Sequence, residues 1–260
     1  MINFKVYGNK PISTVLVHGG PGAAGEMNPL ALELESQYGV IEPYQTKESI
    51  EAQVKELKAI ILANCEYPVN LIGHSWGAWL SIILASNYPD IVKKMILVSS
   101  GSFEEHYADK INEYRFNRLN NKEQNKVKKL LKLLKGNIPL NNKNLAFSKL
   151  GNIFSKADSF DSIDNNVAPI NCQYHIFCKI WKEASILRKT GKLLAYTKTI
   201  TCPVVAIHGS YDTHSPEGVK IPLSDNVSNF KFILLQKCGH TPWFEKHAQN
   251  KFFEIIKNEL

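Results

Sequence analysis

One segment of the chain, Gly73–Gly77, carries a serine between two glycines, with the sequence Gly-His-Ser-Trp-Gly and the spacing GxSxG. The apolar run Val69–Ile72 precedes it and a helical pattern begins near Trp76, and this strand–turn–helix setting is that of a nucleophile elbow. Such a tight turn projects the Oγ of Ser75 from the sheet edge, and small residues on both sides let the strand and helix approach. The turn also points the N–H of Trp76 toward the reaction centre, at the positive end of a helix. The segment therefore predicts Ser75 as a nucleophile for acyl transfer.

A serine nucleophile needs a general base, and His240 is placed best of the eight histidines. It follows the apolar run Phe232–Leu235 and precedes the last helical pattern. Because parallel strands end at a common edge of a sheet, a histidine there lies on the same side as the elbow. The pKa of histidine lies near working pH, which suits proton transfer to and from the serine.

The base in turn needs an acid that orients it. Asp212 comes directly after the apolar run Val204–His208, again at the end of a predicted strand. Asp225 is the competitor, although its surroundings indicate a helix end or turn. The order Ser75, Asp212, His240, with each residue at a strand end, predicts a catalytic triad.

A second backbone donor is needed for the oxyanion that forms during acyl transfer. The segment His18–Gly22 has the sequence His-Gly-Gly-Pro-Gly and follows the predicted strand Thr14–His18. Glycines let the backbone approach the oxyanion, so we assign the donor to the N–H of Gly20, with Gly19 as the alternative. The phosphate-binding patterns GxGxxG and GxxxxGK[ST] are both absent from this loop.

Apolar, β-branched runs alternate with helix-length segments along most of the chain. Six runs are predicted as buried strands: Thr14–His18, Gly39–Ile41, Val69–Gly73, Met95–Ser99, Val204–His208 and Phe232–Leu235. Four intervening or terminal segments are predicted as helices: Lys47–Asn64, Trp76–Tyr88, Thr213–Leu223 and Pro242–Glu259. This alternation indicates an α/β fold with a mostly parallel central sheet and helices on both faces.

The alternation stops after the fourth of these strands, and helical patterns take over until the chain reaches Cys202. Leu119–Lys135 and Asn171–Thr190 are the clearest helices, while Asn137–Asn144 is rich in asparagine, contains Pro139 and is predicted as a loop. We expect residues 1–100 and 199–260 to form the core and residues 101–198 to form a helical cap.

The chain has 260 residues and a net charge of +7, and the excess lies in the middle. Residues 101–200 contain 18 basic and 9 acidic side chains, with lysines densest between Lys122 and Lys135. We interpret these lysines as the solvated face of a helix, since no aromatic residues or nucleic-acid motif accompany them. We expect no nucleic acid and no membrane as partner.

Neither a signal peptide nor a membrane helix is visible in the sequence, so we expect a cytoplasmic protein. The five cysteines are scattered without a CxxC pair, which is typical of free thiols and indicates no metal site.

Together these motifs resemble the α/β-hydrolase superfamily over nearly the whole chain, including the order of the triad. HGGPG with GHSWG is most similar to the proline iminopeptidase branch. That resemblance implies a helical cap, a Ser-Asp-His triad and no metal or cofactor. It also implies removal of N-terminal residues, especially proline, from peptides.

The chain departs from that branch in several places. The segment 39–49 lacks the DQRGxGxS motif, and Ala78 replaces the second glycine of GxSxGG. An exopeptidase also needs an acidic side chain for the substrate's ammonium group. Trp181 and Glu183 are candidate substrate-binding residues, with Glu104 and Glu105 as further acidic candidates, but a basic cap does not favour a cation.

The prediction is therefore a serine hydrolase that cleaves a small carboxylic ester or amide through an acyl-enzyme on Ser75. An aminopeptidase similar to proline iminopeptidase is the first alternative. A non-catalytic ligand-binding protein on the same scaffold is the second, because fold alone does not determine function. Transfer to an acceptor other than water, or hydrolysis of a C–C bond, would use the same triad.

Overall fold

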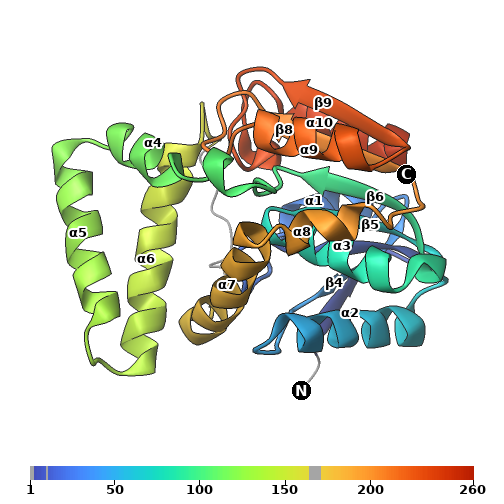
Figure 1. The fold of residues 1–260 in the computed structure, drawn as a ribbon, viewed down its shortest axis with the longest axis horizontal. Coiled ribbons are helices and arrows are strands. Elements are labelled where there is room, and N and C mark those ends of the chain that lie inside the picture. The colour runs from blue at the N-terminus through green and yellow to red at the C-terminus, as the bar shows by residue number, and fades with distance from the viewer. Residues whose placement is uncertain (1–2, 10, 164–170) are drawn as a thin grey trace.

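A seven-stranded sheet forms the centre of the molecule in the computed structural model, which describes residues 3–9, 11–163 and 171–260. The strand order is β1-β4-β2-β5-β6-β8-β9 (Figure 1). The strands are β1 (Phe4–Tyr7), β2 (Ile12–Val17), β4 (Gly39–Pro43), β5 (Val69–His74), β6 (Val92–Val98), β8 (Val204–Gly209) and β9 (Phe230–Leu235). All neighbours are parallel except β1, which runs antiparallel to β4. The predicted α/β class with a mostly parallel sheet is confirmed.

All six predicted strands form, and the sequence patterns missed only short ones. Strand β1 lies at the sheet edge with Lys5 and Val6 exposed, so it lacks the continuous apolar run that marks its neighbours. The two-residue strands β3 (Ala23–Ala24) and β7 (Asn171–Cys172) pair with each other, and neither is long enough to show a period.

The buried strands alternate between two hydrophobic layers, because successive side chains of a strand point to opposite faces. Val15 and Val17 pack in one layer with residues of α2 (Ile50–Asn64), α3 (Trp76–Asn87), α7 (Tyr174–Lys189), α8 (Lys192–Thr197) and α9 (Glu217–Asn226). Leu16 packs in the other with α1 (Asn28–Leu34) and α10 (Gln249–Glu259). Both faces of the sheet are therefore covered, which explains why its central strands β2, β5 and β8 are buried along almost their whole length.

One helix prediction and one loop prediction were wrong. Pro242–Glu259 is not one helix: a 3-10 turn at Pro242–Phe244 is separated from α10. Glu245 interrupts it, because its buried carboxylate accepts three backbone N–H groups from Gly239, Phe160 and Asp161. The expected loop at 137–144 was also wrong, since α6 (Leu140–Asp158) begins there. Pro139 occupies its N-cap position, where a missing N–H costs no helical hydrogen bond.

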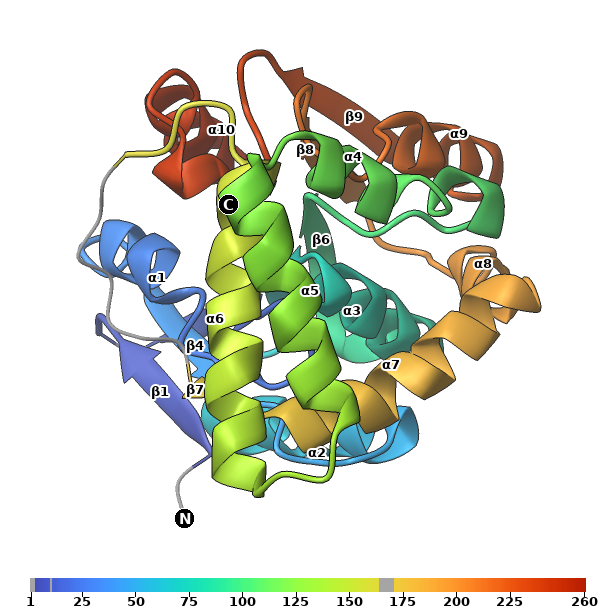
Figure 2. The same cartoon turned by 90° about the vertical axis from the view of Figure 1, so that its left-hand side faces the viewer.

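Among the described residues, five α-helices lie between β6 and β8, in the stretch predicted to be helical. They are α4 (Ile111–Asn117), α5 (Asn121–Lys135), α6, α7 and α8. Helices α5 and α6 form an antiparallel hairpin that stands at the left-hand edge in Figure 1 and in front of the sheet in Figure 2. In the described part of the chain, no helix is both long and apolar enough to cross a bilayer.

Candidate active site

Ser75 stands at the turn between β5 and α3, in a backbone conformation that side-chain-bearing residues rarely adopt. Its φ of 51° and ψ of −114° lie outside the broad allowed regions, which is the kind of strain found at functional sites. Every other residue from Val69 to Ala85 is buried, whereas Ser75 is partly exposed. The turn therefore presents one hydroxyl at the surface of an otherwise closed core.

The two glycines of the GxSxG segment are required by packing. A Cβ on Gly77 would lie 2.0 Å from the carbonyl oxygen of Val17, because α3 crosses β2 at this point. A Cβ on Gly73 would lie 2.5 Å from the carbonyl oxygen of Gly77. The spacing thus reflects the close approach of strand and helix that the tight turn demands.

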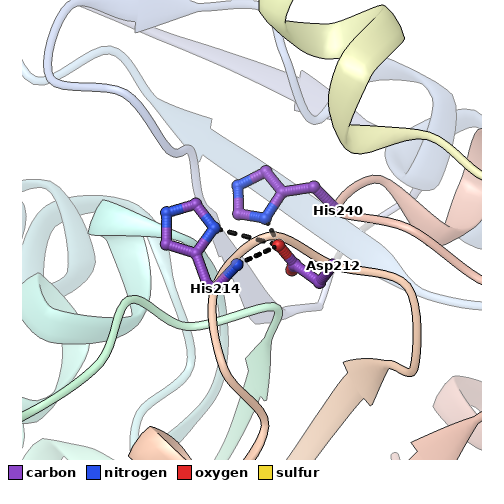
Figure 3. A group of neighbouring side chains, drawn as sticks. All are labelled: Asp212, His214 and His240. Carbon is purple, nitrogen blue, oxygen red and sulfur yellow. Dashed lines mark hydrogen bonds and ion pairs between the residues drawn. The ribbon is translucent and has the colours of Figure 1, made fainter. Parts of the chain in front are cut away.

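Asp212 and His240 are joined by a hydrogen bond of 2.7 Å between Nδ1 of the imidazole and Oδ2 of the carboxylate (Figure 3). The Asp212 side chain is fully buried, and the His240 side chain is 14% exposed. Burial alone would raise the pKa of Asp212, but the neighbouring His240 and His214 lower it well below the usual carboxyl range. A buried carboxylate that stays ionised suits the orienting role predicted for Asp212.

Ser75 and His240 belong to adjoining segments of the site but are not hydrogen-bonded. The ring of His74, the residue before Ser75, lies 4.9 Å from the ring of His240, centroid to centroid. Among the described residues the Ser75 hydroxyl makes no hydrogen bond. Catalytic hydrogen bonds are often long without substrate and tighten only when substrate binds. The missing bond between Ser75 and His240 is therefore what we expect of such a site without substrate.

The backbone of His240 is held from both sides. Its N–H donates to the carbonyl oxygen of Asp158 at 3.0 Å, and its own carbonyl accepts from His74 Nε2 at 3.0 Å. Asp158 in turn is paired with Arg115 and accepts from the Thr213 hydroxyl. The loop that carries the base is therefore tied to the end of α6 and to the nucleophile turn.

Glu26 and His74 form an ion pair beside the nucleophile, which the sequence patterns did not reveal. His74 Nδ1 donates to Glu26 Oε2 at 3.1 Å while its Nε2 donates to a carbonyl, so both ring nitrogens carry protons and the imidazole is charged. Burial would raise the pKa of Glu26, but His74 lowers it to about 2. Burial would likewise lower the pKa of His74, and Glu26 reverses that shift and raises it.

The Glu26 carboxylate distinguishes the two candidate oxyanion donors, because it binds the N–H of only one of them. The N–H of Gly19 donates to Glu26 Oε2 at 2.6 Å and is thus occupied. Within the described residues, no hydrogen bond uses the N–H of Gly20 or that of Trp76. Of the two alternatives left open by the sequence, Gly20 is the one whose backbone N–H is available to an oxyanion.

Gln45 links the oxyanion loop to Trp76, the residue that follows Ser75. Its side-chain nitrogen donates to the carbonyl of His18 at 2.7 Å, and its oxygen accepts from the indole N–H of Trp76 at 3.0 Å. The residue has a left-handed φ of 50°. The segment without the DQRGxGxS motif therefore still contributes a side chain that braces the site.

His214 is a second histidine bound to the Asp212 carboxylate. Its Nδ1 and its backbone N–H each lie 2.9 Å from Asp212 Oδ1. Its ring stacks on that of His240, with centroids 4.5 Å apart and planes 24° from parallel. The only sequence signal was its position two residues after Asp212, which the patterns do not single out.

These three side chains also place potential metal-ligand atoms within 4.8 Å of one another. Each imidazole already directs its Nδ1 to the carboxylate, with Oδ1 and Oδ2 taking one ring each. The contacts are thus those of an acid that accepts hydrogen bonds from two imidazoles.

The candidate substrate residues are not gathered around Ser75. Glu183 accepts the N–H of Ile50 at 2.9 Å and so binds the start of α2. It lines an open groove of about 480 Å³ with Ile83 and Tyr88, toward the far end of α3. A helix of this length spans about 18 Å from the nucleophile turn. The prediction that Glu183 contacts substrate is therefore not supported by its position.

The remaining candidates are placed as follows. Trp181 stacks on Trp79, with ring centroids 5.9 Å apart and planes 7° from parallel, and is partly exposed. Glu105 is paired with Arg188 at 2.7 Å. Asp225, the competitor for the acid role, is exposed on α9. The site thus uses Asp212 rather than Asp225 as the partner of His240.

We expect Glu26→Gln to lower the free energy of unfolding by about 3 kcal/mol at pH 6, since the pKa of Glu26 falls from 4.5 to about 2 on folding. A carboxylate with a lowered pKa stabilises the fold fully above pH 4.5, and this contribution is lost as the pH falls toward 2. Urea unfolding measures the change. Glu33→Gln is the matched control, because its ion pair with Lys257 lies at the surface, with the two side chains 37% and 32% exposed, and is expected to contribute less than about 1 kcal/mol. Equal effects of the two substitutions would contradict a structural role for the buried pair.

Comparisons with known proteins agree with this architecture. The sequence profile of the family described as alpha/beta hydrolase fold matches residues 15–247. Among curated proteins no sequence matches the chain.

Three solved structures illustrate the similarity in fold. Est816, an N-acyl homoserine lactone degrading enzyme, is 15% identical with a TM-score of 0.65, covering 99% of this chain and 96% of its own. The meta-cleavage product hydrolase of Pseudomonas fluorescens IP01 is 19% identical with a TM-score of 0.65, covering 98% and 93%. The thioesterase domain from the curacin biosynthetic pathway is 17% identical with a TM-score of 0.62, covering 98% and 94%.

Proposed function

The chain belongs to the α/β-hydrolase fold family, and on this premise we propose that it is a serine hydrolase that cleaves a small carboxylic ester or amide. The observation that carries the proposal is the hydrogen bond between His240 and the buried, ionised Asp212, beside a strained turn whose one partly exposed residue is Ser75. An acid–base pair and a presented hydroxyl are the parts that acyl transfer to serine requires.

The proposed reaction has two halves. His240 removes the proton of Ser75 as its Oγ attacks the carbonyl carbon, and then protonates the leaving alcohol or amine. Water, activated by the same imidazole, hydrolyses the acyl-enzyme and restores the serine. Asp212 holds the Nδ1–H tautomer of His240 and stabilises its charged form. The free N–H groups of Gly20 and Trp76 would stabilise the oxyanion, where one such donor is worth about 10²–10³ in rate.

An ester or a small amide is favoured over the N-terminus of a peptide. An aminopeptidase needs a carboxylate free to bind the substrate's ammonium group, yet Glu183 is bound to the start of α2 and Glu105 is paired with Arg188. The helices inserted between β6 and β8 would form a cap over the site, with Trp181 as a candidate contact for an apolar acyl group. The structural neighbours are named for a lactone, a thioester and a meta-cleavage product, so the fold leaves the scissile bond open.

The test is covalent labelling together with a matched substrate panel. A fluorophosphonate should modify the protein once, and peptide mass spectrometry should locate the adduct on Ser75. p-Nitrophenyl acetate and butyrate should be hydrolysed faster than proline and alanine p-nitroanilides. Faster release from the anilides would favour the aminopeptidase alternative. An absence of both labelling and turnover would favour the non-catalytic alternative.

We expect kcat/KM to fall at acidic pH with a midpoint below 6.5. Burial lowers the pKa of His240, the positive charges of His214 and His74 add to that effect, and Asp212 only partly offsets it. Because the neutral imidazole is the base, activity is retained at neutral pH and lost as the pH falls through the lowered pKa. His214→Gln should move the midpoint upward, since it removes a charge that opposes protonation of His240. A wild-type midpoint above 6.5 would contradict the lowered pKa of His240.

A further inference from the structure

Helices α5 and α6 form a projecting hairpin, here called the arm (residues 121–158), that the proposed reaction does not explain. The two helices pack on each other through Val127, Leu134, Ala146 and Leu150, and α5 packs chiefly on α6 (Figure 2). The turn between them, residues 136–139, and the adjoining helix ends form the tip of the arm, residues 131–145. An amphipathic pair of this kind is expected to keep its apolar residues inside and its lysines outside.

The arm holds the whole positive excess of the protein. Between residues 124 and 157 there are eight lysines and no acidic residue. The arm as a whole has nine of the chain's 31 basic side chains and two of its 24 acidic ones, which leaves 22 basic against 22 acidic residues elsewhere. With a net charge of +7 on the arm and zero on everything else, the protein presents a strongly polarised surface.

The tip also exposes apolar side chains that a merely solvated face would not carry. Leu131, Leu133, Leu140 and Leu145 are 41%, 47%, 47% and 56% exposed, and Ile138 in the turn is half-buried. At 1.5 Å per residue, all four leucines lie within about 9 Å of the turn along their helices. This depth is comparable with the 5–10 Å to which apolar faces enter the headgroup and acyl boundary of a bilayer.

From these observations we propose that the arm docks on the surface of an anionic lipid bilayer, with the leucines of the tip inserted and the lysines contacting lipid phosphates. Lysine suits such a surface because its stem follows apolar surroundings while its ammonium group reaches the headgroups. A nucleic-acid site is less consistent, since the stretch 124–157 contains no arginine and the apolar tip has no role there. The proposal replaces our sequence-based expectation of no membrane partner and is independent of the proposed hydrolase function.

Docking by the arm would hold the candidate active site at a fixed distance from the lipid. Helix α6 has 19 residues and is thus about 28 Å long. Its far end carries Asp158, whose carbonyl accepts the N–H of His240. The arm is therefore rooted in the loop of the proposed base and reaches outward from it.

Co-sedimentation of the full-length protein with lipid vesicles tests the proposal. We expect binding to vesicles of equimolar phosphatidylglycerol and phosphatidylcholine, and much weaker binding to phosphatidylcholine alone. Because the chain has five free cysteines and Cys178 is exposed, the native cysteines are first replaced by serine or alanine. An environment-sensitive dye attached at Asn137→Cys in that background should shift to the blue with the anionic vesicles. The same dye at Asn64→Cys, on the end of α2, should not.

Two double variants separate the charge from the apolar tip. K132E/K135E should weaken partitioning by about 30-fold or more, given the contribution of each lysine near an anionic surface. L133N/L140N should weaken it by about 10-fold or more. K93E/K192E makes the same change in net charge on exposed lysines outside the arm and should bind as the wild type does. Hydrolysis of a water-soluble ester should be unchanged in all three variants, and thermal unfolding would show that each is folded.

Four results would overturn the proposal. The first is no binding to anionic vesicles by a folded protein, and the second is binding that L133N/L140N leaves unchanged. The third is a homodimer, seen by light scattering and lost in L133N/L140N, without vesicle binding. Oligonucleotide binding that depends on Lys132 and Lys135, again without vesicle binding, would assign the arm to nucleic acid and likewise overturn it.

Discussion

Ser75→Ala is expected to lower kcat/KM for a p-nitrophenyl ester by about 10⁴–10⁶-fold and to abolish labelling by a fluorophosphonate. The reason is that no other described hydroxyl combines a partly exposed position at the strained turn with the neighbouring His240. The substitution removes one oxygen atom and keeps the Cβ, so the packing of β5 against α3 is preserved. Stopped turnover with an unchanged thermal midpoint would identify the hydroxyl as the nucleophile.

Ser210→Ala is the matched control for this substitution. Ser210 is exposed directly after β8, at the same edge of the sheet, and its side chain makes no hydrogen bond with a described residue. Its loss should leave both labelling and turnover at wild-type values. Labelling that persists in Ser75→Ala would show that another nucleophile reacts and would remove the basis of the proposed function.

The sheet and the positions of the catalytic candidates were predictable because both depend on local patterns. Continuous apolar runs indicated strands that are buried on both faces, and Val15, Leu16 and Val17 do divide between two hydrophobic layers. The tight turn at Ser75 requires small residues at two positions, so the five consecutive residues Gly73–Gly77 are enough to predict it. Asp212 and His240 followed from the same rule, since each comes just after a strand.

Residues that act across long sequence separations were not predictable. Glu26 and His74 are 48 residues apart, and Gln45 reaches both His18 and Trp76 from an irregular segment. No period or motif marks a buried glutamate that meets a histidine from another loop. Helix starts were misplaced where tertiary contacts decided them, as at Glu245, whose carboxylate binds backbone from three other positions.

Asp212 accepts hydrogen bonds from two histidines, whereas orienting His240 alone would require only one. Oδ1 of Asp212 accepts from the ring and backbone of His214, while Oδ2 accepts from His240 (Figure 3). His208 adds to this arrangement by donating from Nε2 to the carbonyl of His214 at 2.9 Å. Both oxygens of the carboxylate are therefore committed as acceptors, and replacing either with a donor must disturb one imidazole.

Asp212→Asn should therefore lower kcat by about 10³–10⁴-fold, although it changes the shape of the side chain very little. An amide has only one oxygen acceptor, so its NH₂ group must face either His214 or His240. If it faces His240, Nδ1 of the neutral imidazole must accept a hydrogen bond, so the ring proton moves to Nε2. A protonated Nε2 can no longer take the proton of Ser75. If it faces His214, the base keeps its tautomer but loses the negative charge that stabilises its imidazolium form.

The measurement is steady-state kinetics on the ester that the wild type hydrolyses best, with Asp225→Asn as the matched control. Asp225 is exposed on α9 and was the sequence competitor for the same role, so its substitution should change kcat by less than about twofold. A large loss in Asp225→Asn, or full activity in Asp212→Asn, would reverse the assignment of the acid.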